Sequence, residues 1–560
     1  MLRHLDLRLA SISVVSVCFS ALAAFAFGTL QISADPFTNA GSQHMTEVEP
    51  QIFASGSTIV AVFQQGRIFG GGCSDIGFTT SLDNGATWQD GSLPGLTIWS
   101  GGDTYQSVSD PSISYDAAFG VWVVVSLPVG NGNREIFVSL SPDGINWDGP
   151  ISAYRTFSGS FDKTWITCDN WPTSPFYGNC YIEWDDVGAG GTILMMTSTD
   201  GGATWGTPLS TAGRASGLGG QPLAQPSGRV VVPYANFGGN VRAFFSDDGG
   251  NSWSSPVVVA NVNEHFVAGG IRDADLPSAA VDGDGTIYVA WADCRFRAGC
   301  QSNDIVYTSS ADGETWSDVT RAPIDDLTSP ADHFLPGFGA DRNSFAPNVG
   351  LAVVYYYYPQ ASCSSATCQL TVGFITSQDG GNSWSDPVDV GGPMALSWIA
   401  NTNQGRMVGD YFATFYTDDG IPHPVFGSAT PPLGMFFQSM YSTCPDCSSA
   451  AAAQDRLVGS SEAVATPLEE WQAGAVQSPG GTLRVSAEAY RVNIGTVVPL
   501  SATGPAAESF PVLWEVEEGA AGGSVSGGVY TAPLSPGLYH LVSSAGAEKA
   551  RLAIKVFTVQ

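Results

Sequence analysis

The chain has almost no lysine. Only Lys163, Lys549 and Lys555 occur among 560 residues, and lysine and arginine together number 21 against 52 aspartates and glutamates. The formal net charge is therefore −31. A surface this poor in positive charge disfavours nucleic acids and anionic membranes as partners, because both are polyanionic. The composition instead suits a protein that works in an extracellular or salty medium.

Long hydrophobic runs are also lacking, with one exception at the N-terminus. Residues 9–30 are mostly apolar and follow Arg3 and Arg8. Small-residue cleavage positions follow at Ala26 and Ala34. This pattern predicts a signal peptide within residues 1–34, and the alternative is an uncleaved membrane anchor. We expect a secreted or cell-surface protein with no membrane contact once the signal is removed.

Cysteines are few, but most of them lie close together in pairs. The four pairs are Cys168 with Cys180, Cys294 with Cys300, Cys363 with Cys368, and Cys444 with Cys447. In an exported chain, such spacings predict local disulfides that tie hairpin loops. The alternative for Cys444 and Cys447 is half of a zinc site, but no second Cys or His pair follows them. Cys73 has no evident partner.

Glycine, by contrast, is abundant at 67 residues, and it occurs in every copy of one repeated stretch. The clearest copy, residues 198–205, reads Ser-Thr-Asp-Gly-Gly-Ala-Thr-Trp. Six copies occur, and their aspartates are Asp83, Asp143, Asp200, Asp248, Asp312 and Asp379, at intervals of 60, 57, 48, 64 and 67 residues. Self-similarity at this period is typical of propellers and solenoids.

The repeated stretch has the chemistry of a tight turn. Gly accepts a positive φ, and the preceding Asp carboxylate accepts hydrogen bonds from nearby backbone N–H groups. The Ser hydroxyl can bond further turn groups, and the Trp offers a large apolar plate to bury between repeats. A β-rich run precedes each copy. Each copy therefore predicts the hairpin that joins the last two strands of a four-stranded unit.

This stretch resembles the Asp-box, or BNR repeat, of sialidase-like β-propellers. The resemblance implies an all-β fold, with a multi-bladed β-propeller over residues 35–447. Three further β-rich runs follow the sixth box, so seven blades are favoured over six. The segment near His44 is expected to supply the fourth strand of the last blade. The box itself is a structural element of such propellers, so it predicts the fold and leaves the activity open.

The chain changes character after the predicted propeller. Residues 448–478 are rich in Ala and Ser and lose the strand pattern, which is typical of a linker. Alternation returns in residues 479–560, and the run Val529-Tyr530-Thr531-Ala532-Pro533 resembles bacterial Ig-like modules. We expect a small Ig-like β-sandwich there.

Acids stand at the start of several strands that are predicted to be the innermost of their blades. They are Glu49, Asp110, Asp162, Asp275 and Asp410. Innermost strands converge on the central channel, so these acids are candidates for a ligand-binding ring. The alternative is that they bond backbone groups at the strand starts. Such a ring of oxygen ligands would also suit Ca²⁺, and no other cofactor is expected.

The sialidase resemblance implies particular residues as well. Sialidases use three arginines to hold the sugar carboxylate, an Asp as acid/base and a Tyr as nucleophile. The positions that match are Arg67, Arg272, Arg342 and Arg406 for the clamp, Asp75 for the acid/base and Tyr441 for the nucleophile. Glu49 stands where the first clamp arginine of the family is expected. Little or no cleavage of sialosides is therefore predicted.

Three functional hypotheses remain open at this point. The first is a sialidase-like glycoside hydrolase, the second a non-catalytic propeller that binds a glycan or protein, and the third another extracellular enzyme such as a polysaccharide lyase. Paired acids at the channel mouth favour an enzyme, and an acid-poor mouth favours binding. In each case the expected partner is an extracellular glycan or glycoprotein, and the chain is expected to be a monomer.

Overall fold

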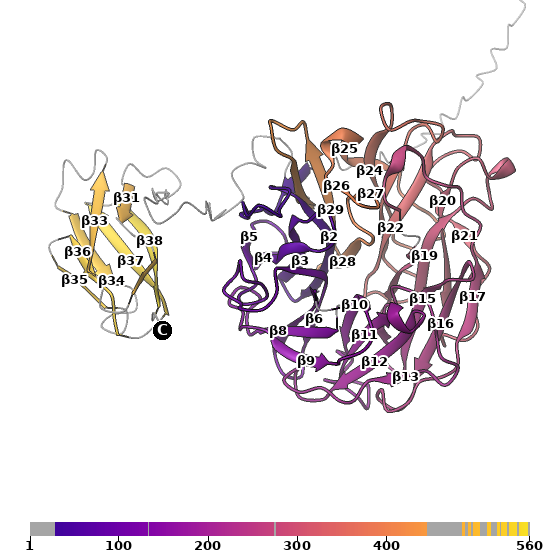
Figure 1. Cartoon of the computed structure of the whole chain (residues 1–560), viewed down its shortest axis with the longest axis horizontal. Coiled ribbons are helices and arrows are strands. Elements are labelled where there is room, and N and C mark those ends of the chain that lie inside the picture. The colour runs from indigo at the N-terminus through magenta and orange to yellow at the C-terminus, as the bar shows by residue number, and fades with distance from the viewer. Residues whose placement is uncertain are drawn as a thin grey trace, which may run out of the picture. The chain divides into compact units, whose positions relative to one another are not determined.

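The computed structural model describes residues 28–130, 132, 134–273 and 276–444, and separate stretches between 484 and 557. The chain divides into two compact units, Met1–Val464 and Ala465–Gln560. Both units consist of β-sheet (Figure 1). Among the described residues, no helix has the length and apolar character needed to span a membrane.

The first unit contains seven successive groups of four antiparallel strands. The first four groups are β2 (Glu47–Ser55), β3 (Thr58–Arg67), β4 (Cys73–Ser81) and β5 (Gln89–Ser92); β6 (Ser107–Asp116), β7 (Val121–Val129), β8 (Glu135–Ser141) and β9 (Ile151–Arg155); β10 (Phe161–Cys168), β11 (Cys180–Asp186), β12 (Thr192–Ser198) and β13 (Leu209–Ser210); and β14 (Leu223–Ala224), β15 (Val230–Asn236), β16 (Asn240–Ser246) and β17 (Val257–Asn261). A single pairing of Cys73 with Val108 joins the first two groups into one sheet.

The remaining groups complete the unit. They are β18 (Ser278–Val281), β19 (Ile287–Asp293), β20 (Asp304–Ser310) and β21 (Thr320–Arg321); β22 (Asp332–Ala340), β23 (Leu351–Tyr358), β24 (Gln369–Ser377) and β25 (Val388–Ala395); and β28 (Ala413–Tyr416), β29 (Pro422–Thr430), β30 (Phe437–Cys444) and β1 (Gly28–Gln31). A short hairpin, β26 (Asn401–Thr402) with β27 (Gly405–Arg406), precedes the last group.

The first strands of the seven groups contact one another in cyclic order: β2, β6, β10, β14, β18, β22, β28 and again β2. Polar side chains of one strand bond the backbone of the next. Gln51 accepts from the Ile113 N–H at 3.0 Å, and Ser278 accepts from the Phe338 N–H at 2.8 Å. In Figure 1 the groups follow one another around the unit in sequence order.

This arrangement gives the central channel two distinct ends. The first strands all begin at one end, which we call the Lys163 end after the residue that lies there. First and third strands of an antiparallel sheet run in the same direction, so the box turns after the third strands lie at the other end. We call that opposite end the Asp-box end.

The apolar core lies between neighbouring sheets. Val60 and Val62 of β3, for example, pack in one cluster with Trp122 and Val124 of β7. The alternation of buried residues along these strands follows from the period of two of a β-strand. Each sheet is therefore covered on both faces by its neighbours, which explains the apolar runs in the second and third strands.

The N-terminal strand of the last group differs from the prediction. Gly28–Gln31, and not the segment near His44, pairs with β30 as the fourth strand. Thr46 makes only an isolated parallel bridge with Gln438. Leu30 is buried in the core beside Met440, so cleavage after Ala34 would remove this strand, whereas cleavage after Ala26 would keep it. Residues 1–27 lie outside the described residues, so the signal peptide stays a prediction.

The repeated stretch forms the turn that its residues predict. Ser198 Oγ accepts from the Gly202 N–H at 3.0 Å, and Asp200 accepts from the Thr204 N–H at 2.9 Å. Gly201 and Gly202 have φ of 71° and 83°. Trp205 Nε1 donates back to the Gly202 carbonyl at 2.9 Å, so the indole closes the turn.

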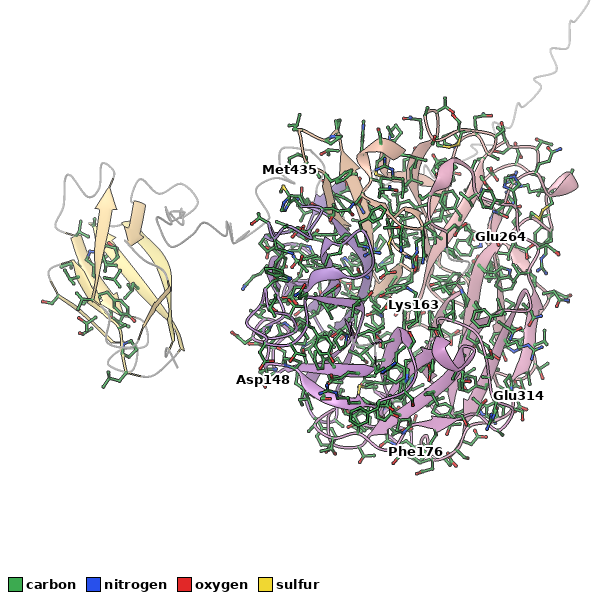
Figure 2. The ribbon with its side chains drawn as sticks, viewed as in Figure 1. Asp148, Lys163, Phe176, Glu264, Glu314 and Met435 are labelled. Carbon is green, nitrogen blue, oxygen red and sulfur yellow. A yellow bond between two sulfur atoms is a disulfide. The ribbon has the colours of Figure 1, made fainter. Side chains whose placement is uncertain are left out.

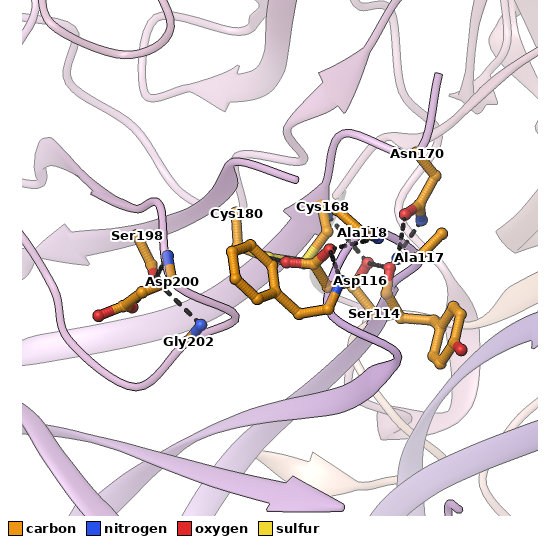
Figure 3. The surroundings of a disulfide bond; sticks show 12 residues. Ser114, Asp116, Ala117, Ala118, Cys168, Asn170, Cys180, Ser198, Asp200 and Gly202 are labelled. Carbon is orange, nitrogen blue, oxygen red and sulfur yellow. Dashed lines mark hydrogen bonds between the residues drawn. A yellow bond between two sulfur atoms is a disulfide. The ribbon is translucent and has the colours of Figure 1, made fainter. Parts of the chain in front are cut away.

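Three predicted disulfides are confirmed: Cys168–Cys180, Cys294–Cys300 and Cys363–Cys368. The first lies between the box turn of Ser198 to Gly202 and the β6–β7 turn at Asp116 (Figure 3). The other two tie loops between second and third strands, at the Lys163 end. Cys444 is disulfide-bonded, and Cys447, its predicted partner, lies outside the described residues. Cys73 is free and buried.

The described stretches of the second unit form two four-stranded sheets. One contains β31 (Arg484–Ala487), β33 (Val497–Thr503), β36 (Val529–Thr531) and β35 (Ser524–Ser526), and the other β32 (Arg491–Asn493), β38 (Glu548–Phe557), β37 (Gly537–Ala545) and β34 (Val512–Val516). The predicted linker, residues 448–478, lies outside the described residues.

Candidate functional site

Four of the first strands are bulged near their start, at the Lys163 end. The residues at the bulges have a left-handed backbone although none is glycine: Glu49, Asp110, Lys163 and Leu335, with φ of 55°, 49°, 41° and 50°. A bulge redirects a side chain relative to the regular pleat, and left-handed non-glycine residues carry a conformational cost. Three of the four redirected side chains are ionisable, and these three meet.

The centre of this meeting point is the ammonium of Lys163 (Figure 2). Its Nζ lies 2.7 Å from Asp410 Oδ2, 3.0 Å from Asp110 Oδ1 and 3.2 Å from Glu49 Oε1. All four side chains are at most 7% exposed. Strands β2 and β6 and the segment just before β28 thus supply one carboxylate each to a single buried cation. We call these four residues the Lys163 cluster.

The charges of the cluster are strongly interdependent. Burial by itself would lower the pKa of Lys163, but Asp110, Asp410 and Glu49 together raise it well above its usual value. Burial would likewise raise the pKa of Asp410, but Lys163 and Arg272 lower it to about 2. For Glu49, burial prevails over Lys163 and raises the pKa to about 8. At neutral pH the cluster therefore holds Glu49 mostly protonated and Asp410 ionised.

Further basic and aromatic side chains enclose the cluster. Arg272 pairs with Asp410 from outside the cluster, and its side chain is 19% exposed. The Tyr411 ring lies 5.6 Å from Lys163 Nζ, and its hydroxyl donates to the Pro111 carbonyl at 3.1 Å. Arg67 is buried and donates to the Ile68 carbonyl at 2.7 Å. These side chains together keep the cluster almost completely buried.

A pocket of about 370 Å³ lies at the same end, on the far side of Arg272. Its lining includes Arg406, Asn401, Ser397, Ser365 and the backbone of Gly270. Gly270 lines the pocket, and Arg272, two residues later, pairs with Asp410 of the cluster. The Arg272 backbone N–H donates to the Arg406 carbonyl at 2.6 Å. The volume falls in the range of small-ligand sites, and its lining offers hydroxyl, amide and guanidinium groups.

The structure thus brings together several residues that the sequence singled out. Glu49, Asp110 and Asp410 converge on Lys163, Arg272 pairs with Asp410, and Arg406 lines the neighbouring pocket. Asp162 lies beside them on β10, and its pKa is raised by burial. Asp275 lies outside the described residues. The acids are therefore joined by a lysine and do not form an open acidic ring.

Other predicted residues lie elsewhere. Asp75 on β4 is wholly buried, and burial raises its pKa well above the usual value. Tyr441 lies on β30, where its hydroxyl donates to Gln31 of the outer strand β1 at 3.3 Å. Arg342 follows β22 at the Asp-box end. The geometry therefore offers Asp75 and Tyr441 no shared exposed surface at which to act as acid and nucleophile.

The Lys163 cluster does not fit a Ca²⁺ ion. The ammonium already occupies the point at which its three carboxylates meet, and two positive charges there would repel each other. Elsewhere in the described part of the chain, Asp304, Asp325 and His333 lie close enough together to hold an ion. Arg297 bonds both of these aspartates at 2.6 Å, so it already supplies the positive charge.

Lys163 is the residue that sequence reasoning missed. The sequence pattern pointed to the five acids at the strand starts and not to the lysine beside Asp162. Its rarity was the available signal, since no other lysine occurs among residues 28–444. Lys163 occupies the bulge position at which β2 and β6 carry Glu49 and Asp110.

Comparison with known proteins gives a partial family match. Residues 180–335, which include three of the six boxes, match the model of the BNR repeat-like domain. No curated protein matches the chain.

Several solved structures are similar to the chain at low identity. A Hadza microbial sialidase is 16% identical over 62% of this chain and 66% of its own, with a TM-score of 0.38. The NanB sialidase from Streptococcus pneumoniae is 16% identical over 74% of this chain and 70% of its own, with a TM-score of 0.37. An ulvan lyase is 12% identical over 77% of this chain and 98% of its own, with a TM-score of 0.41.

Proposed function

We propose that this chain is an extracellular, seven-bladed Asp-box propeller protein that binds a glycan at the Lys163 end and does not cleave sialosides. The cyclic contacts of seven first strands support the blade count. The three disulfides support an oxidising location. The second unit is inferred to be an Ig-like module that acts as a spacer or an additional binding unit.

The observation that carries the binding function is the contrast between the cluster and its pocket. The carboxylates that could perform chemistry are buried and lie within 3.2 Å of Lys163 Nζ, which holds them in place. The neighbouring pocket of about 370 Å³ instead presents Arg406, Asn401 and two serine hydroxyls. Sugars are recognised by such planar and hydroxyl hydrogen-bonding groups, so the pocket suits recognition.

A sialidase reaction has little support in this geometry. Its acid/base and nucleophile would have to lie together beside the sugar, whereas Asp75 is wholly buried and Tyr441 bonds the outer strand. Glu49 also takes the position of the first clamp arginine and contacts Lys163. An anionic sugar carboxylate would therefore meet an acid where the family supplies a cation.

One observation favours a second candidate, a hydrolase of neutral glycans. A carboxyl group with a pKa of about 8, as Glu49 has, is protonated at neutral pH and is thereby suited to general-acid catalysis. This candidate requires the cluster to open, because Glu49 is 1% exposed. It predicts turnover that disappears in Glu49→Gln.

The test combines a glycan array with a panel of fluorogenic glycosides, using the full chain. We expect saturable binding of an oligosaccharide, at least tenfold weaker in Arg406→Met and in Ser365→Trp, which fills the pocket from an exposed loop. Arg155→Met, on a side chain that is 60% exposed at the outer strand β9, is the matched control and should bind normally.

Two results would contradict the proposal. If neither pocket variant weakens binding, the glycan does not bind in this pocket. Robust turnover of a sialoside would show that the protein is a sialidase after all. Turnover of a neutral glycoside that is lost in Glu49→Gln would establish the hydrolase instead.

A further inference from the structure

The Asp-box end of the channel contains an arginine without a charged partner. Arg342 follows directly after β22, in a turn that is fixed by the Asn343 N–H donating to Asp341 Oδ1 at 2.9 Å. Its guanidinium lies over the Trp171 ring, 4.8 Å from the ring centroid, and 5.9 Å from that of Phe53. Within the described part of the chain, it forms no ion pair and no hydrogen bond.

Arg342 also lines a cavity inside the channel. This cavity has a volume of about 80 Å³ and is bounded by residues from the first strands of all seven groups, among them Phe53, Thr167, Ala224 and Phe415. It is distinct from the pocket beside Arg406, which lies at the Lys163 end. Polar and apolar groups both line the wall, and the guanidinium of Arg342 is its charged group.

One further polar side chain of the cavity has a hydrogen-bond donor to spare. Gln51 lines the cavity and uses its carbonyl oxygen to accept from the Ile113 N–H at 3.0 Å. Its amide NH₂ is therefore the half that remains available. Asp169 is the nearest acid that acts on Arg342, but its oxygens accept from Ser174 Oγ and from the Trp171 N–H. Asp169 therefore acts on Arg342 through space, without an ion pair between the two groups.

Electrostatics then dictates what the site should attract. A guanidinium stays protonated at any physiological pH, and a partly desolvated charge without a counter-ion is costly. The two aromatic rings compensate only part of this cost, because a cation–π contact is worth about 0.5–2 kcal/mol. The rings cover the face of the guanidinium, which leaves its edge donors to bind a ligand in the plane.

We propose that Arg342, together with the Gln51 amide, forms a carboxylate-binding site at the Asp-box end of the channel. The fork of guanidinium donors matches a planar carboxylate in bidentate geometry. A cavity of about 80 Å³ admits a carboxylate with a short substituent and is smaller than ordinary ligand pockets. The source is either a free small acid or the acidic end of a longer chain, such as a uronate that enters from the mouth.

The test is equilibrium dialysis of the full chain against radiolabelled acetate, with glucuronate, chloride and sulfate as unlabelled competitors at constant ionic strength. We expect one saturable acetate site per chain, with affinity reduced at least tenfold in Arg342→Met. Arg342→Lys keeps the charge but loses the fork, so it should bind with intermediate affinity. Arg155→Met is the matched control and should bind as the wild type does.

The competitors distinguish the sources and the chemistry. Glucuronate that binds where acetate does not would keep the carboxylate site and assign it to the end of an acidic glycan. Chloride or sulfate competing as well as a carboxylate would reduce the site to an unspecific anion site and overturn the proposal. So would equal acetate binding by the wild type and Arg342→Met, or no saturable binding of either carboxylate. Glycan binding at the pocket beside Arg406 is unaffected by any of these outcomes.

Discussion

The two ends of the channel differ in how their charged side chains are stabilised. At the Lys163 end, three carboxylates and one ammonium satisfy one another within 3.2 Å, and Arg272 adds a second cation. At the Asp-box end, Arg342 has two aromatic rings and no acid. The first arrangement neutralises its charges, and the second leaves donors available. The comparison shows that a cluster of acids need not be the reactive part of a fold, because neutralised charge is poorly available to ligands.

The repeated box turns also differ from the residues that occur only once in the first unit. Each box turn at the Asp-box end uses its carboxylate internally, as Asp200 does on Thr204. Lys163 and the Arg406 pocket, which each occur once in the first unit, lie at the other end. The repeated residues therefore build the ring of strand groups. Residues that occur only once are better candidates for binding a particular ligand.

The largest expected effect comes from removing the central cation. Lys163→Met leaves Glu49, Asp110 and Asp410 buried around an apolar side chain, and breaking a buried ion pair on one side costs about 3–5 kcal/mol. Denaturant unfolding should show this loss of stability. Arg155→Met, which removes an exposed cation, should change stability by less than about 1 kcal/mol.

A second variant checks the cause of that loss. Asp110→Asn in the Lys163→Met background removes one of the stranded carboxylates, so the double variant should be less destabilised than the sum of the two single variants. Additive effects would mean that Lys163 stabilises the fold by packing and that the charges are independent.

The next effect sharpens the structural role of the boxes. Trp88 is 1% exposed and packs with Leu30, Val425 and Met440, so Trp88→Ala should cost about 3–5 kcal/mol. Trp205 is only partly buried, and Trp205→Ala should cost less, about 1–3 kcal/mol. Thermal and denaturant unfolding measure both. Glycan binding in native buffer should be unchanged, and its loss in a variant that remains folded would contradict the purely structural role of the boxes.

Much of the scaffold could be predicted because it depends on local patterns. The box turns, the β-rich runs and the three disulfides each follow from residues close in sequence, such as Cys363 and Cys368. The fourth strand of the last sheet could not be predicted in this way, since Gly28–Gln31 pairs with β30 from the far end of the unit. The apolar character of residues 9–30 also favoured its assignment to the signal peptide.

The candidate site was predicted only in part for a related reason. Strand position placed Glu49, Asp110 and Asp410 at one end, but the direction of each side chain depends on a bulge and a left-handed residue that the sequence does not specify. Asp75 and Tyr441 were carried over from the sialidase pattern, and such a carry-over assumes equivalent side-chain directions. Burial of Asp75 depends on the packing of a distant loop around Thr97, whose hydroxyl donates to the Ser74 carbonyl.

The smallest expected effect is a pH dependence of stability that arises from the raised pKa of Glu49. Its pKa is raised to about 8 in the folded chain from an ordinary value of 4.5. Between these values the folded state holds a proton that the unfolded state has released, so stability should fall as the pH rises through this window. One such group contributes a slope of at most about 1.4 kcal/mol per pH unit. Asp410, with its pKa lowered to about 2, loses its contribution only as the pH falls below about 4.

Glu49→Gln isolates this contribution because the amide keeps the shape and cannot titrate. Asp35 and Asp90, whose pKa values are raised to about 6, give slopes of the same sign in both proteins, so the difference between the two curves belongs to Glu49. Urea midpoints measured from pH 5 to pH 9 should decline more steeply for the wild type than for Glu49→Gln. Parallel curves would mean that Lys163 keeps Glu49 ionised throughout, and the cluster would then be a fully charged network without a general acid.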